Sequence, residues 1–191
     1  MKKLYIISGC NGAGKTTASY TILPEILNCK EFVNADEIAR GLSPFKPEGA
    51  NILAGRVMLE RIKYLLKNGE DFAFETTLAT KSYTHFIKEA KNLGYSVSLL
   101  FFWLNSTELA INRVKLRVAE GGHNIPEDVI RRRYHNGLKN FFNLYQSIVD
   151  QWMLIDNSGT PYELIVEAKS EFTNVINFKT WGKLKSLYYG K

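Results

Sequence analysis

Residues 9–16 read Gly-Cys-Asn-Gly-Ala-Gly-Lys-Thr and match the phosphate-binding pattern G-x-x-x-x-G-K-[ST]. The glycines let backbone N–H groups turn toward phosphate oxygens, and the N-terminus of a following helix adds its positive end. Lys15 would reach the β- and γ-phosphates, and the Thr16 hydroxyl would hold Mg²⁺. A glycine-rich turn without a ligand is the alternative, but the apolar strand before the run and the helix-compatible stretch after it fit the motif. We therefore predict a nucleoside triphosphate site at Gly9, Cys10, Asn11, Gly12, Ala13, Gly14, Lys15, Thr16 and Thr17.

Two acidic residues follow predicted strands, where ligands of open α/β sheets bind. Asp36 follows the strand 31–34 and could accept the proton of an attacking hydroxyl or help to hold Mg²⁺. Capping the short helix that follows is an equally natural role for Asp36, and the residues alone leave both open. Glu75 ends an apolar strand, and Thr76 and Thr77 add hydroxyl groups for a second substrate. We expect Glu75 to be functional rather than a simple strand-end cap, because an acidic group there needs partners.

Arginines that lack a local acidic partner are candidates for clamping phosphate. Arg113 and Arg117 lie four residues apart on one predicted helix face, a repulsive arrangement that suits a nearby anion, although Arg117 could instead pair with a glutamate three residues later. Arg131 and Arg132 each have an acidic residue four positions before them, which predicts surface ion pairs. Arg133 has no such partner, so Arg117 and Arg133 are the preferred phosphate clamps.

Strands alternate with helices along the chain, which predicts an α/β fold with a mostly parallel sheet of five or six strands and helices on both faces. Gly121 and Gly122 form a flexible joint in a basic helical lid, residues 113–135, and His123 beside them either contacts phosphate or is exposed. The C-terminal extension, residues 171–191, is either a docked helix or a tail that binds a partner. Expected strands span residues 3–8, 31–34, 71–75, 95–104, 152–155 and 164–166, and expected helices 15–28, 48–67, 82–93, 106–119 and 127–150.

Bulk composition fits one domain with a sizeable core, residues 1–191. Apolar runs are too short to span a bilayer, and the N-terminus leads directly into the first strand, so we expect neither a membrane segment nor a signal peptide. Cys10 and Cys29 are expected to be reduced thiols in a cytoplasmic protein. The net charge of +6 is compatible with nucleic acid, but a chain that holds a triphosphate and a second anionic substrate also needs positive charge. We favour a small phosphorylated ligand.

The phosphate loop, the Asn34-Ala35-Asp36 segment, Glu75-Thr76-Thr77 and the lid from Arg117 to residue 123 together resemble the zeta-toxin family of P-loop kinases over residues 1–157. In that family an ATP-dependent kinase phosphorylates a sugar hydroxyl of UDP-N-acetylglucosamine, and a cognate antitoxin restrains it. The resemblance implies that Asp36 is the general base and that Glu75 and Thr77 contact the second substrate. It also implies that Arg117 is a lid arginine on the triphosphate.

Two positions depart from the family pattern. A second lid arginine is replaced by His123 in a simple register, so Arg131 or Arg133 would have to supply that charge. A substrate-binding glutamate of the helix before the third strand is replaced by Leu59, with Arg56 a turn earlier as a substrate-side candidate. These departures predict an altered acceptor site in a small zeta-like kinase.

The combined interpretation is an ATP- and Mg²⁺-dependent phosphotransferase acting on a small hydroxylated acceptor, with a UDP-amino sugar as the first expectation and an antitoxin as a possible partner. A polynucleotide kinase or another small-metabolite kinase is the first alternative. The second is a binding module that ATP switches without phosphoryl transfer. Asp36 and Glu75 argue against the second alternative, since a pure switch needs no base directed at an acceptor.

Overall fold

The strand that precedes the phosphate loop, β1 (Lys2–Ser8), lies in the interior of a mixed sheet in the computed structural model, which describes residues 1–122, 124–170 and 172–190. Over these residues the sheet has seven strands in the order β2-β3-β1-β4-β5-β6-β7. The first five in this order run parallel, and β6 and β7 are antiparallel to their neighbours. The strands span β2 (Glu31–Val33), β3 (Phe72–Thr76), β4 (Tyr95–Trp103), β5 (Gln151–Asp156), β6 (Glu163–Lys169) and β7 (Phe172–Val175).

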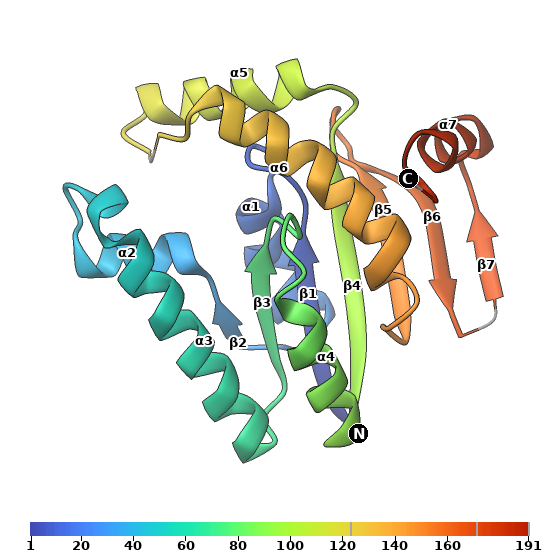
Figure 1. Ribbon diagram of the computed structural model, residues 1–191, viewed down its shortest axis with the longest axis horizontal. Coiled ribbons are helices and arrows are strands. Elements are labelled where there is room, and N and C mark those ends of the chain that lie inside the picture. Colours follow the sequence, from blue (N-terminus) through green and yellow to red (C-terminus); the bar gives the residue numbers. More distant parts are fainter. Residues whose placement is uncertain (123, 171, 191) are drawn as a thin grey trace.

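Helices cover both faces of the parallel part of the sheet, as the alternation of elements predicts. Figure 1 shows α3 (Asn51–Asn68), α4 (Tyr83–Asn92) and α6 (Glu127–Asn140) in front of the sheet and α1 (Lys15–Thr21) behind it. The near-continuous apolar sequences of β1 and β4 follow from this arrangement, because their central residues are buried on both faces. α5 (Thr107–Ala119) lies across the carboxyl ends of the strands, above the phosphate loop (Figure 1).

Two predicted helices are shorter than expected, and each ends in a π-helical turn. The helix expected over residues 15–28 is α1 followed by η1 (Ile22–Ile26), where Pro24 has no N–H to continue an α-helix. The helix expected over residues 127–150 is α6 followed by η3 (Phe141–Tyr145) and a turn into β5. The remaining helical elements are α2 (Ala35–Leu42) and the 3₁₀ turn η2 (Pro47–Ala50).

The C-terminal extension holds a strand that the sequence analysis missed and a docked helix that it offered as one of two possibilities. β7 pairs with β6, so the described residues form a sheet of seven strands where five or six were expected. The helix α7 (Phe178–Tyr188) packs on η3, where Trp181 stacks on Phe142 with ring centroids 5.3 Å apart. Among the described residues, no helix has the length and apolar character needed to cross a membrane.

Candidate active site

The phosphate loop connects β1 to α1, and internal contacts hold its shape. The ammonium group of Lys15 is buried and donates a hydrogen bond to the carbonyl oxygen of Cys10 at 3.0 Å. Asn157, which directly follows β5, donates from Nδ2 to the carbonyl oxygen of Ala13 at 2.8 Å. Asn157 is a residue that the sequence analysis missed, although its place after a strand's carboxyl end could have indicated it.

Glu75 connects the phosphate loop to the end of β2. Because β1 and β3 pair in parallel with Ile7 opposite Glu75, the carboxylate lies beside the loop. Its Oε1 is 3.3 Å from Nζ of Lys15, and its Oε2 accepts hydrogen bonds from the Thr16 hydroxyl at 2.7 Å and from Nδ2 of Asn34 at 2.9 Å. Glu75, which was predicted on the acceptor side, therefore contacts Lys15 and Thr16 of the phosphate loop as well.

Asp36 lies in the first turn of α2, but it does not cap that helix. The side chain of Asn34 is the cap, and its Oδ1 accepts hydrogen bonds from the backbone N–H of Asp36 at 2.8 Å and of Glu37 at 3.3 Å. With the described residues, the carboxylate of Asp36 makes no hydrogen bond or ion pair. Of the two roles left open by the sequence, capping therefore belongs to Asn34, and Asp36 lines the two cavities described next.

A first cavity, of about 350 Å³, lies between the phosphate loop and α5. We call it the donor cavity. It brings together the phosphate-loop residues and two of the arginines that the sequence analysis singled out. Arg113 also donates a hydrogen bond to the carbonyl oxygen of Ser158 at 3.1 Å, which fixes its position. The donor cavity is lined by Asn11, Gly12, Gly14, Lys15, Thr16, Thr17, Asp36, Glu75, Arg113, Leu116, Arg117 and Glu120.

A second cavity, of about 200 Å³, lies between the end of β3, α3 and α6. We call it the acceptor cavity. Three threonines and Tyr83 are part of its lining, and Tyr83 stacks on Phe74 with ring centroids 4.9 Å apart. It is lined by Asn11, Lys15, Asn34, Ala35, Asp36, Met58, Glu75, Thr76, Thr77, Thr80, Tyr83 and Arg133. The two cavities share Asn11, Lys15, Asp36 and Glu75, so these residues stand where the cavities meet.

The arginines separate into cavity residues and surface residues. Arg133 lies in the acceptor cavity and donates to Oδ1 of Asn11 at 3.1 Å. Burial lowers the pKa of its guanidinium group, and the nearby carboxylate of Asp36 opposes that shift. Arg131 instead pairs on the surface with Glu108 of α5, at 2.7 Å. The predicted pairing within α6 is therefore wrong in its partner, because α5 and α6 lie side by side and their charges pair across the two helices.

Some sequence-derived candidates lie elsewhere, and others were missed. Arg56 is exposed on α3 and lines neither cavity, because Met58 is the α3 residue that faces the acceptor cavity. Leu59 is half-buried against the core. His123 lies outside the described residues. The acceptor-cavity residues that the sequence analysis missed are Met58, Thr80 and Tyr83, for which apolar periodicity and loop composition give no functional signal.

The side chains at the phosphate loop could hold a magnesium ion only together with oxygen ligands from a bound nucleotide. Among the described residues, no group of three or more His, Cys, Asp or Glu side chains could hold a metal ion. The Thr16 hydroxyl and the Glu75 carboxylate, 2.7 Å apart, are the hard oxygen donors that Mg²⁺ prefers.

Comparison with known proteins identifies the family. The family model described as Zeta toxin matches residues 46–164, more than half of the chain. The chain belongs to the zeta toxin family. An uncharacterized protein of Haemophilus influenzae is 32% identical to this family member over 140 residues, which cover 70% of the chain and 98% of that protein.

Solved structures share the fold of this zeta toxin family member. The PezAT chromosomal toxin-antitoxin system of Streptococcus pneumoniae matches with a TM-score of 0.68 and 18% identity, over 100% of this chain and 80% of that chain. The AvrRxo1-ORF1:-ORF2 structure with ATP gives a TM-score of 0.74 and 16% identity, over 96% of this chain and 63% of that chain. Deoxyadenosine kinase from M. mycoides with bound dATP gives a TM-score of 0.53 and 19% identity, over 83% of this chain and 92% of that chain. At these identities the likeness shows the P-loop kinase fold, as the sequence predicts.

Proposed function

We propose that this zeta toxin family member is an ATP- and Mg²⁺-dependent kinase that phosphorylates a hydroxyl group of a small acceptor. The observation that carries the proposal is the junction of the donor and acceptor cavities at Lys15, Asp36 and Glu75. Phosphoryl transfer needs the attacking and leaving oxygens in line, with positive charge and a base between two bound substrates. Two cavities that share Lys15 and the acidic residues Asp36 and Glu75 support such an arrangement.

The residues at the junction take separate roles in this proposal. Lys15 neutralises charge on the β- and γ-phosphates, and the Thr16 hydroxyl is a ligand for Mg²⁺, which when bound supplies further charge neutralisation. Asp36 accepts the proton of the acceptor hydroxyl as that hydroxyl attacks the γ-phosphorus. The half-buried position of Asp36 at the junction, with its capping role taken by Asn34, supports this assignment.

Arg117 and Arg133 approach the transferred group from opposite cavities. Arg117 lines the donor cavity and Arg133 lines the acceptor cavity, where it contacts Asn11 of the phosphate loop. Guanidinium groups bind phosphate oxygens with two parallel hydrogen bonds, so the pair would stabilise charge on the transferring group from two sides. In this proposal Arg133 takes the place of the second lid arginine of the family, at whose position this sequence has His123.

A UDP-amino sugar such as UDP-N-acetylglucosamine is the proposed acceptor. Family membership and the lining of the acceptor cavity support it. The hydroxyls of Thr76, Thr77 and Thr80 can exchange hydrogen bonds with sugar hydroxyls, and Tyr83 offers an aromatic wall to the apolar face of a sugar ring. Met58 adds apolar surface on the α3 side of the cavity.

A protein antitoxin is the proposed partner. The similar structure from Streptococcus pneumoniae belongs to a toxin-antitoxin system, and it aligns over the whole of this chain. A net charge of +6 would favour an acidic antitoxin. Co-purification of this protein with the product of a neighbouring gene, followed by a kinase assay with and without that product, tests the partnership.

The decisive experiment measures product formation from labelled ATP and UDP-N-acetylglucosamine by the wild-type protein and by Asp36→Asn. We expect the variant to bind ATP with unchanged affinity and to form product about 10²- to 10⁴-fold more slowly. Glu37→Gln is the control at the adjacent position, because Glu37 pairs with Arg40 at 3.1 Å and lines neither the donor nor the acceptor cavity. Transfer by Asp36→Asn at the wild-type rate would show that Asp36 is not the base.

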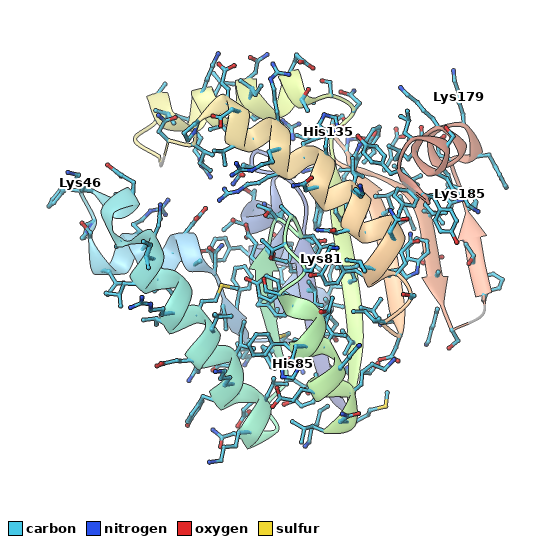
Figure 2. The ribbon with its side chains drawn as sticks, in the orientation of Figure 1. Lys46, Lys81, His85, His135, Lys179 and Lys185 are labelled. Atoms are coloured by element: carbon cyan, nitrogen blue, oxygen red, sulfur yellow. The ribbon has the colours of Figure 1, made fainter. Side chains whose placement is uncertain are left out.

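The same assay separates the alternatives when it offers a 5′-hydroxyl oligonucleotide beside the sugar nucleotide. The net charge is compatible with a polynucleotide. Figure 2 shows, however, that Lys179 and Lys185 lie on α7, on the other side of α6 from α2 and α3, and no residue of α7 lines the acceptor cavity. A product on the oligonucleotide alone would replace the small acceptor with a polynucleotide. Tight ATP binding without transfer to any acceptor would favour the switched binding module.

A further inference from the structure

The loop between β3 and α4, residues 77–82, forms one wall of the acceptor cavity, and we call it the acceptor loop. Thr77 and Thr80 of this loop line the cavity. Leu78 between them has a left-handed backbone, with φ of +58°, and its side chain is fully buried in the core. A leucine rarely adopts this conformation, so neighbouring groups must hold it there.

One face of α6 contacts both the phosphate loop and the acceptor loop. Arg133, Gly137 and Asn140 are spaced at i, i+4 and i+7, so they lie in a single stripe along the helix. Arg133 reaches Asn11 of the phosphate loop. At Gly137 the helix approaches the acceptor loop so closely that a Cβ atom would lie 2.7 Å from the carbonyl oxygen of Thr77.

Two buried side chains then bind the backbone of the acceptor loop. Nδ2 of Asn140 donates a hydrogen bond to the carbonyl oxygen of Leu78 at 2.8 Å. The hydroxyl of Tyr145 donates to the carbonyl oxygen of Thr80 at 2.7 Å. Both donors are buried, and together they fix the two carbonyls on either side of Ala79.

The π-helical turn η3 explains why Tyr145 reaches the loop. In a continuous α-helix the stripe of Asn140 would continue at Leu144, four residues later. The wider turn, in which the N–H of Gln146 bonds to the carbonyl of Phe141 at 3.2 Å, adds one residue and places Tyr145 five positions after Asn140. Tyr145 is fully buried, whereas Leu144 is only half-buried.

We infer that Asn140 and Tyr145 are positioning residues that fix the acceptor loop and thereby set the affinity for the acceptor, a role that rests on the proposed kinase function. Neither side chain lines the donor or the acceptor cavity. Their contacts end on the loop that carries Thr77 and Thr80, so loss of either hydrogen bond should loosen acceptor binding and leave ATP binding unchanged.

Tyr145→Phe tests this inference, because it removes one hydroxyl and keeps the ring. Tyr95→Phe is the matched control: Tyr95 is also a buried tyrosine whose hydroxyl donates to backbone carbonyls, of Glu70 at 2.9 Å and Leu65 at 3.2 Å. Tyr95 lies at the opposite end of the sheet, at the start of β4. Both variants lose a comparable hydrogen bond, so they should be destabilised to a similar extent.

The measurements are the KM for UDP-N-acetylglucosamine, the Kd for ATP, and deuterium exchange of the peptide that spans residues 77–82. For Tyr145→Phe we expect the acceptor KM to rise about five- to tenfold and exchange of the acceptor loop to accelerate, with an unchanged ATP Kd. Tyr95→Phe should change neither the KM nor exchange of the loop. Asn140→Asp, which replaces the donor amide with an acceptor, should repeat the Tyr145→Phe result.

Equal effects of Tyr145→Phe and Tyr95→Phe on the KM and on exchange of the loop would overturn the inference. A wild-type protein that forms no product from UDP-N-acetylglucosamine would contradict the proposed acceptor instead. In that case exchange of the acceptor loop still decides whether Asn140 and Tyr145 fix it, because that measurement needs no acceptor.

Discussion

Lys15 and Glu75 form a buried ion pair, with 3.3 Å between Nζ and Oε1 and with exposed side-chain fractions of 6% and 11%. Such a pair is stable only if each charge has further hydrogen-bond partners. Lys15 has the carbonyl of Cys10, and Glu75 has the Thr16 hydroxyl and the Asn34 amide. One carboxylate therefore orients both phosphate-loop side chains that the proposed chemistry needs.

Glu75→Gln should destabilise the protein, because it leaves the ammonium group of Lys15 buried without its counter-charge. Breaking a buried ion pair from one side costs about 3–5 kcal/mol, and the remaining amide oxygen can keep part of the hydrogen bonding, so we expect a loss of about 2–4 kcal/mol. Urea unfolding at neutral pH measures it. Glu37→Gln, which breaks the exposed pair with Arg40, should cost less than about 1 kcal/mol. Equal losses in the two variants would mean that the buried Lys15–Glu75 pair contributes no more to stability than the exposed Glu37–Arg40 pair.

Arg133→Ala should slow phosphoryl transfer far more than Arg131→Ala, although the two residues lie on the same helix. Arg133 contacts Asn11 in the acceptor cavity, whereas Arg131 pairs with Glu108 on the surface. Loss of one donor that stabilises transition-state charge lowers kcat by about 10²- to 10³-fold. We expect that loss for Arg133→Ala and a change of less than about threefold for Arg131→Ala. Steady-state kinetics with saturating ATP measures both, and similar kcat values would remove Arg133 from the proposed mechanism.

The sequence predicted the order of the elements well, because buried parallel strands are apolar throughout and glycines mark helix ends. It failed where hydrogen bonding rather than apolar periodicity decides. β7 is a short edge strand with an exposed Phe172, so it lacks the apolar pattern of a buried strand. The π-helical turn η3 leaves the apolar pattern intact, and only the wider hydrogen-bond spacing shows that α6 has ended.

The sequence pointed to the whole phosphate loop but to only part of the lining of the acceptor cavity. The phosphate loop has a fixed spacing, and the strand-end rule pointed to Asp36 and Glu75. The acceptor cavity depends on which face of a helix meets a loop, and Met58 and Tyr83 look like ordinary core residues in the sequence. The sequence separated Arg133 from Arg131, but the partners that the structure gives them, Asn11 of the phosphate loop and Glu108 of α5, are far away in the chain and could not be read from the spacing within α6.

Gly9→Ala should abolish ATP binding, since Gly9 has φ of +138° and a Cβ atom there would overlap the carbonyl oxygen of Phe102 on β4. The phosphate loop would have to move away from β4 to accept the methyl group, which would disperse the N–H groups that bind phosphate. Gly41→Ala is the control within the same chain. Gly41 lies in α2 with open space around its Cα, so alanine there should stabilise the protein by about 0.5–1 kcal/mol. Isothermal titration with ATP measures binding, and retained affinity in Gly9→Ala would argue against a tight approach of the loop to β4.

Cys29 should make the protein less stable in alkali. Burial raises the pKa of its thiol from 9.0 to about 11. The unfolded chain therefore loses this proton above pH 9 while the folded protein keeps it until about pH 11, so the stabilising contribution is complete below pH 9 and is lost as the pH rises toward 11. The free energy of unfolding should fall by about 2 kcal/mol at pH 11 because of this thiol. Cys29 lies outside the proposed site, and Cys29→Ala removes the thiol. The lost packing should lower the free energy of unfolding by about 1 kcal/mol at pH 8. Urea unfolding at pH 8 and pH 11 under reducing conditions should show the wild type as the more stable protein at pH 8 and the variant as at least equal at pH 11. A constant difference between the two proteins at both pH values would mean that the Cys29 thiol titrates alike in the folded and unfolded states.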